Sequence, residues 1–243
     1  MIYKTKGIVL RPVKYGETSL IVSIFTSLFG IQSYLINGVR TSGKTTKAHL
    51  YQPASVLEME VYHKELKNLQ RIKESRWNYL YQTIFSDVTK NAVALYMVEL
   101  LQKCLKQPEQ NTDLFNFCED AFMQLDVSDP IVTANFPLYF CLQLASFLGL
   151  RLSDDHSAKN IYMDLEEGRF IDHIPAHHHF LDTDLSSHIS QLLKAQHPEE
   201  LYEIKLNHVT RRKLLFALHD FYGLHIQDFG TMKTLHILHE VLG

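Results

Sequence analysis

The sequence predicts an α+β protein, with a five-stranded β-barrel of the OB type over residues 1–77 and a helical domain over residues 78–243. In the first part, apolar and polar residues alternate with the period of a β-strand. From Trp77 onward, apolar residues recur at the three- and four-residue spacing of helices. Five short strands favour a small barrel over a sandwich, which usually needs about seven.

Each expected barrel strand has an apolar face. Leu57, Met59 and Val61 alternate with Glu58 and Glu60, which is the pattern of a half-buried strand. Glycines lie between the earlier strands, where tight turns need them. The expected strands are residues 8–11, 20–25, 33–36, 54–62 and 69–75, with turns at Gly16, Gly30 and Gly38.

The expected helices begin at capping residues and carry apolar stripes. Thr112, Thr183 and either Asn207 or Thr210 are suited to cap helices, and Pro137 is expected to kink or restart the most apolar one. The expected helices are residues 77–106, 112–125, 129–149, 183–196, 207–223 and 231–242. The stretch at about 151–182 has no clear period, so we expect an irregular, polar, histidine-rich segment there.

Composition excludes several classes of protein. With 46% apolar and 21% charged residues, the chain is typical of a globular protein rather than a disordered one. No apolar run reaches the roughly 18 to 20 residues that cross a bilayer, and the start lacks a signal core. The three cysteines form no CxxC pair, which argues against a disulfide framework or a zinc ribbon. We expect a cytoplasmic, nucleoid-associated protein.

Positive charge is concentrated in the first third of the chain. Residues 1–80 hold twelve Lys or Arg against five Glu, a net +7, whereas the whole chain has a net charge of -3, which leaves -10 for the rest. A basic part on an acidic body predicts a local face that binds a polyanion, and we expect nucleic acid.

Basic residues interleaved with aromatic ones in the barrel predict the DNA-binding surface. Such surfaces bind single strands by neutralising phosphates and stacking bases. For any one residue, a solvated sheet face is the alternative. The predicted DNA-binding residues are Arg11, Lys14, Tyr34, Arg40, Lys44, Lys47, Lys64, Lys67, Arg71 and Lys73, and Tyr15 and Tyr62 also look exposed.

Residues Gly38 to Thr45 match the phosphate-binding pattern G-x-x-x-x-G-K-[ST]. A nucleotide-hydrolysing site of this kind also needs a helix directly after the loop, inside a parallel α/β sheet. Pro53 follows nine residues after Lys44, so little room remains for such a helix. We expect instead a basic loop whose Gly, Thr, Lys and Arg contact DNA phosphates without catalysis.

Neither a metal site nor a catalytic signature is expected. His173 and His177 have i,i+4 spacing, but Pro175 between them argues against a helix, so a solvated loop is favoured over a zinc or nickel site. The chain has no G-x-S-x-G or H-E-x-x-H motif. We therefore predict a protein without enzyme activity or cofactor.

Several stretches resemble the RecO family of bacterial recombination mediators. The resemblance rests on residues 7–30, with Gly16-Glu17 and Phe25-Thr26, and on Gly38-Val39-Arg40 at the entry to the basic loop. Weaker echoes lie at residues 136–150 and 211–224. The resemblance implies an OB barrel with a helical domain. The chain differs from the family at residues 151–182, where many members carry four zinc-binding cysteines and this chain has no cysteine.

By resemblance, the expected function is to bind single- and double-stranded DNA, anneal complementary strands and help load the recombinase. The expected partners are RecR and the acidic, apolar C-terminal tail of the single-strand-binding protein. Arg211, Arg212 and Lys213, next to Leu214 and Leu215, are candidates for docking that tail, and a solvated helix start is the alternative. An NTPase using Gly38–Thr45 and a non-enzymatic protein scaffold remain the alternative functions.

Overall fold

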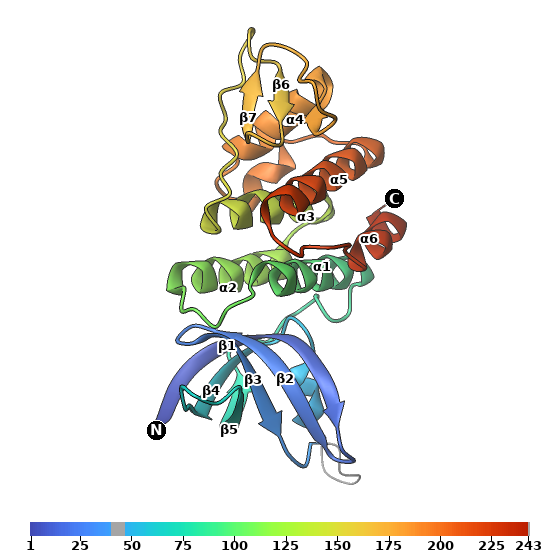
Figure 1. Ribbon diagram of the computed structural model, residues 1–243. Coiled ribbons are helices and arrows are strands. Elements are labelled where there is room, and N and C mark those ends of the chain that lie inside the picture. The colour runs from blue at the N-terminus through green and yellow to red at the C-terminus, as the bar shows by residue number, and fades with distance from the viewer. Residues whose placement is uncertain (40–46, 243) are drawn as a thin grey trace. The chain divides into compact units, whose positions relative to one another are not determined.

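The computed structural model describes residues 1–39 and 47–242. Of Lys47 it describes the backbone but not the side chain. The chain forms two compact units (Figure 1). Unit 1 comprises residues 1–86 and 98–126, and unit 2 comprises residues 87–97 and 127–243. The predicted α+β fold is confirmed, because a closed five-stranded barrel precedes six α-helices in the described part of the chain.

The barrel closes in the order β1-β2-β3-β5-β4. All neighbouring strands are antiparallel except β3 and β5, which run parallel. A five-residue 3-10 helix, Lys47–Tyr51, precedes β4. The strands are β1 (Ile2–Tyr15), β2 (Ser19–Thr26), β3 (Gly30–Ile36), β4 (Val56–Tyr62) and β5 (Leu69–Trp77).

Strand β1 is longer than its sequence pattern indicates, since it begins at Ile2 rather than at Ile8. Its first half pairs with β4, from Ile2 opposite Tyr62 to Ile8 opposite Val56, and its second half pairs with β2. A register shift between Val9 and Arg11 marks a bulge at which the strand changes partners. One long bent strand can thus pair on both sides and close the barrel.

The barrel core follows the alternation of the strands. Val22 and Ile24 of β2 and Tyr34 of β3 face inward. Leu57, Met59 and Val61 of β4 also face inward, as their alternation with Glu58 and Glu60 predicts. At the β2–β3 turn, Gly30 has a φ of +61°, and a Cβ added there would lie 2.2 Å from the carbonyl oxygen of Glu109. The backbone at residue 109 therefore packs against this turn only because residue 30 is glycine.

Helix α2 (Thr112–Val127) packs on the barrel inside unit 1. Phe115 of α2 lies 5.5 Å, between ring centroids, from Phe25 of β2, and the Lys6 ammonium binds the Glu119 carboxylate. The cap of α2 is Asn111, whose side chain accepts from the Leu114 N–H, rather than the expected Thr112.

Helix α1 runs from Val88 to Cys104. It begins eleven residues after the start of the helix expected over residues 77–106. The Asp126 carboxylate accepts the backbone N–H groups of Gln82, Thr83 and Ile84, which holds this connection in a non-helical form. Asp87 then caps α1 by accepting the Lys90 N–H.

Unit 2 contains α3 (Pro130–Phe147), which runs through Pro137 as one helix. It is apolar and long enough to cross a membrane by composition, and 67% of it is buried within the protein, as in a core helix. Asp129 caps it, and Asp182, not the expected Thr183, caps the next helix. The remaining helices are α4 (Thr183–Lys194), the 3-10 helix Pro198–Tyr202, α5 (His208–His225) and α6 (Thr234–Leu242).

The segment expected to be irregular, at about 151–182, contains a small antiparallel sheet in the order β7-β6-β8. Asp164 organises its turn, because its carboxylate accepts the N–H groups of Glu166 and Glu167. Helix α5 passes the expected stop at Gly223 and ends at His225, and its cap is Asn207, one of the two residues expected. The strands are β6 (Tyr162–Asp164), β7 (Arg169–Ile171) and β8 (Phe180–Leu181).

Candidate nucleic-acid interface

The strand register places two rows of side chains on the outside of the barrel. In the first row, Arg11, Ser23 and Ser33 lie opposite one another across β1, β2 and β3, and the row continues to Leu69. In the second row, Val13, Ile21 and Leu35 lead to Arg71 of β5. These residues are exposed or half-buried, whereas the residues that alternate with them on β2 and β3 are buried, namely Leu20, Val22, Tyr34 and Ile36. We call this surface, Arg11, Val13, Ile21, Ser23, Ser33, Leu35, Leu69 and Arg71, the β2–β3 face.

The β2–β3 face carries cations without acidic partners. Arg11, Arg71 and the nearby Lys14 are exposed and form no ion pair within residues 1–39 and 47–242. Strands β2 and β3 contain no charged residue at all. Arg11 and Arg71 are three strands apart, about 14 Å along the sheet at the usual strand spacing. The face is thus an uncharged strip with a cation on either side.

The outer surface of β4 is different, because its charges neutralise one another. Lys73 Nζ lies 2.7 Å from Glu60 Oε2, and Lys4 Nζ lies 3.9 Å from Glu60 Oε1. Arg76 Nη2 lies 2.6 Å from Glu58 Oε2. The hydrogen bond and charge of Lys73 lower the pKa of Glu60 below its ordinary value. Lys73, one of the predicted DNA-binding residues, is therefore already paired.

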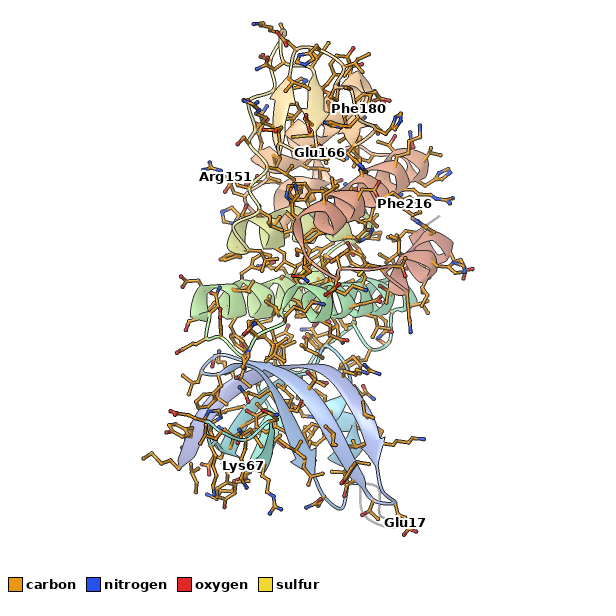
Figure 2. The ribbon with its side chains drawn as sticks, viewed as in Figure 1. Glu17, Lys67, Arg151, Glu166, Phe180 and Phe216 are labelled. Atoms are coloured by element: carbon orange, nitrogen blue, oxygen red, sulfur yellow. The ribbon has the colours of Figure 1, made fainter. Side chains whose placement is uncertain are left out.

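The loop between β4 and β5 presents Lys64 and Lys67 to solvent. The buried amide of Gln70 donates to the carbonyl oxygens of Lys64 and Lys67, at 2.8 and 2.6 Å, and accepts the Lys64 N–H at 3.0 Å. Figure 2 shows Lys67 in this loop and Glu17 in the β1–β2 turn. In OB folds, the second and third strands and these two loops commonly bind oligonucleotides.

Tyr34 does not belong to this surface, which corrects the sequence-based expectation. Its side chain is 0% exposed and lies in the barrel core, because it pairs with the inward-facing Val22. A ring in that position cannot stack on a base. Tyr15 and Tyr62 are 54% and 43% exposed and lie at the margins of the β2–β3 face.

Two further predicted residues, Arg40 and Lys44, lie outside the described residues, and so does the side chain of Lys47. The same holds for most of the Gly38–Thr45 motif. After it, the described chain forms the 3-10 helix Lys47–Tyr51 and then β4 of a closed barrel. That architecture is not the parallel α/β sheet in which a nucleotide-hydrolysing loop of this type lies.

The histidine-rich segment uses His177 within its own fold. His177 Nε2 lies 3.3 Å from Asp164 Oδ2, and His177 Nδ1 accepts the His179 N–H at 3.2 Å. His173 instead contacts its neighbour Asp172. Across the part of the chain that the structure describes, His, Cys, Asp and Glu side chains form no group of three or more suited to a metal ion.

Arg211, Arg212 and Lys213 differ in exposure and in the contacts that they make in unit 2. Arg211 is partly buried, and its Nη1 donates to the Leu206 carbonyl at 2.6 Å, while burial lowers its pKa. Arg212 lies over the Phe216 ring at 5.6 Å, and Lys213 is exposed. Arg211 and Arg212 also line one small, largely apolar cavity of about 70 Å³ together with Leu215. Figure 2 labels Phe216 on α5.

Arg211 lines a cavity of about 590 Å³ that sequence reasoning missed. Its walls are largely apolar, and Lys205 and Arg211 are the only charged residues among those that line it. Asn135 is 1% exposed and donates to the Ile204 carbonyl, which fixes the cavity wall. The cavity arises where α3 meets the start of α5, a contact between segments some seventy residues apart. No local pattern could have revealed it.

Comparison with known proteins identifies relatives of the whole chain. Residues 1–81 match the family described as Recombination protein O N terminal, and residues 85–234 match Recombination protein O C terminal. The chain is 32% identical to DNA repair protein RecO of Phocaeicola vulgatus over 241 residues, 99% of each chain. It is 34% identical to DNA repair protein RecO of Flavobacterium johnsoniae over 247 residues, 98% of each chain.

Proposed function

The chain belongs to the RecO family, and we propose that it is a recombination mediator that binds single- and double-stranded DNA and anneals complementary strands. With RecR, it would help load the recombinase on single-stranded DNA coated by the single-strand-binding protein. Its place of action would be the cytoplasm, at the nucleoid. The observation that carries the DNA-binding part of this proposal is the contrast between the unpaired cations of the β2–β3 face and the paired charges on β4.

DNA binding follows from the chemistry of that face. Lys and Arg release condensed counterions when they neutralise phosphates, and this term dominates sequence-independent binding. Arg11, Lys14 and Arg71 bind no carboxylate in residues 1–39 and 47–242, so phosphate contact breaks no ion pair there. Lys64 and Lys67 would extend the contact along the ordered loop.

Annealing requires no active-site chemistry under this proposal. Two complementary strands repel each other through their phosphates, and cations that neutralise the phosphates lower the barrier to pairing. The protein would therefore act without a catalytic residue or a cofactor.

An annealing assay with two charge-matched variants tests the proposal. The first variant, Arg11→Gln/Lys14→Gln/Arg71→Gln, removes the two cations of the β2–β3 face and Lys14 near the end of β1, which form no ion pair within residues 1–39 and 47–242. The second, Lys4→Gln/Lys73→Gln/Arg76→Gln, removes three cations that are paired with Glu58 and Glu60. We expect the first variant to lose annealing of labelled complementary oligonucleotides and the second to retain most of it. Equal losses, or no annealing by the unaltered protein, would contradict the proposal.

The cavity beside Arg211 is the proposed docking site for the tail of the single-strand-binding protein. An acidic, apolar peptide end suits apolar walls with Lys205 and Arg211 at their edge. Because Arg211 is partly buried, a carboxylate bound there would be shielded from water and its hydrogen bonds strengthened. The larger cavity between α5 and α6, about 970 Å³, is less suited, since Asp220 and Glu240 line it.

Titration of a fluorescent peptide with the sequence of that tail tests the docking site. We expect Lys205→Ala and Arg211→Ala each to weaken binding about tenfold, the usual effect of losing one charge-assisted hydrogen bond. Lys213→Ala is the matched control, because Lys213 is an exposed cation on the same helix that does not line the cavity. Unchanged affinity in the Lys205 and Arg211 variants would rule the cavity out.

A further inference from the structure

We infer that the β2–β3 face holds a DNA strand by its phosphates and sugars and leaves the bases turned toward solvent. This inference rests on the proposed function and adds how the strand lies. It follows from three observations, namely the donors of the face, the lack of outward aromatic rings on β2 and β3, and the lack of outward base-reading groups on these two strands.

Three of the four residues in the first row carry phosphate-binding groups, and the fourth is Leu69. Arg11, Ser23 and Ser33 lie opposite one another on three adjacent strands. Serine hydroxyls and guanidinium groups are common donors to phosphate oxygens. The second row, Val13, Ile21 and Leu35, is aliphatic and offers a flat surface for the sugar faces, with Arg71 at its end.

Aromatic rings, on which bases usually stack, are missing from the strip itself. Among the described residues of β2 and β3, Tyr34 lies in the core and Phe25 is buried against Phe115. The undescribed residues 40–46 contain no aromatic residue by sequence. The exposed rings of Tyr15 and Tyr62 border the strip, since Tyr15 follows Val13 by two residues on β1 and Tyr62 of β4 lies opposite Arg71.

Outward side chains that read base edges are missing from β2 and β3 as well, so such groups occur only at the sides of the strip, as Arg11 and Arg71. Sequence-specific contacts come chiefly from Arg, Lys, Asn, Gln and carboxylate side chains that reach base edges. The outward positions of β2 and β3, all within the described residues, carry only serine or apolar side chains. The Gln32 side-chain amide donates a hydrogen bond to the Phe29 carbonyl oxygen, and Asn37 Oδ1 accepts one from the Ser19 hydroxyl. The strip therefore gains little from contact with a base.

A strand held in this way keeps its pairing edges available. A complementary strand can then pair with it while it is still bound, so annealing needs no prior release from the protein. Base-stacking binders must give up their stacks first, at about 1–3 kcal/mol per base, or roughly 5- to 150-fold in the equilibrium for each base.

The test compares labelled oligonucleotides of equal length, one with ordinary bases and one made entirely of abasic sites. We expect the two affinities to agree within about twofold, whereas loss of even one stacked base would weaken binding at least about fivefold. A parallel measurement with 2-aminopurine at a central position should show that acrylamide quenches the bound base as readily as the free one.

Variants separate the two ways of binding. Ser23→Val/Ser33→Val should weaken binding of both oligonucleotides equally, and Tyr15→Leu/Tyr62→Leu should leave both unchanged. An abasic oligonucleotide that binds fivefold or more weakly, or a shielded 2-aminopurine, would overturn the outward-base arrangement while leaving DNA binding intact. Failure of the ordinary oligonucleotide to bind at all would instead overturn the proposed function, and this inference with it.

Discussion

The Lys6 ammonium of β1 binds both oxygens of the Glu119 carboxylate of α2, with Nζ–O distances of 3.0 and 2.8 Å. The Glu119 side chain is only 8% exposed, and its Oε1 also accepts from Asn78 Nδ2 at 2.7 Å. This carboxylate thus ties the first strand and the end of the barrel to α2 within unit 1.

Lys6→Met should destabilise the protein, because the buried Glu119 carboxyl would lose its cation and keep Asn78 as its one side-chain donor among the described residues. The expected loss is about 1–3 kcal/mol in the free energy of unfolding, the usual cost of an unsatisfied buried group. Urea denaturation at pH 7 measures it. Lys4→Met is the control, since Lys4 is exposed and 3.9 Å from Glu60, and its effect should stay below about 0.5 kcal/mol.

Asp126→Asn should destabilise the protein in a pH-dependent way. Burial by itself raises the pKa of Asp126, but the N–H groups of Gln82, Thr83 and Ile84 outweigh burial, and the pKa lies below its ordinary value. A lowered pKa stabilises the folded state above the unfolded pKa of about 3.9, and this stabilisation is lost as pH falls through the folded value. Urea midpoints of the two proteins should therefore differ at pH 7 and converge below about pH 4. A constant difference across that range would contradict this role.

Arg71→Gln and Lys73→Gln should affect DNA binding differently, although the two residues lie on one strand. Arg71 is unpaired among the described residues, whereas Lys73 is bound to Glu60. We expect Arg71→Gln to reduce the slope of log affinity against log salt by about 0.7, the value for one phosphate of a single strand, and Lys73→Gln to leave it nearly unchanged. Fluorescence anisotropy at several salt concentrations measures the slope for each variant. A larger reduction in Lys73→Gln than in Arg71→Gln would contradict the assignment of DNA to the β2–β3 face.

Tyr34→Phe should leave DNA binding unchanged and keep or raise stability. The Tyr34 hydroxyl is buried and has no hydrogen-bond partner among the described residues, and burial raises its pKa above the ordinary value. Removing an unsatisfied hydroxyl costs no hydrogen bond. Tyr34→Ala, in contrast, should lower the unfolding free energy by about 3–5 kcal/mol through the cavity it leaves. A DNA-binding loss in stable Tyr34→Phe protein would restore Tyr34 to the interface.

The order of elements could be predicted from the sequence because it is encoded locally. The alternation around Leu57 to Val61 and the caps at Asp129 and Asn207 need only neighbouring residues. The start of α1 could not be predicted, since the Asp126 carboxylate that holds residues 82–84 is some forty residues away.

The candidate site was only partly predictable, for the same reason. Net charge located a basic region, but the register decides which cations are neutralised. Lys4 lies opposite Glu60, whereas Arg11 lies opposite Ser23. The inward position of Tyr34 could not be predicted, because both faces of residues 33–36 contain apolar side chains and the alternation alone does not tell which face is inside.

The most direct test of the DNA-binding face is fluorescence anisotropy of labelled single-stranded DNA over a salt series, without nucleotide or metal. The unaltered protein, the Arg11→Gln/Lys14→Gln/Arg71→Gln variant and the Lys4→Gln/Lys73→Gln/Arg76→Gln variant are compared. We predict steeply salt-dependent binding whose slope falls by about 2 only in the first variant, as three single-strand phosphate contacts at about 0.7 each imply. Binding that is absent at low salt, or equal slopes in the two variants, would contradict the assignment of DNA to the β2–β3 face.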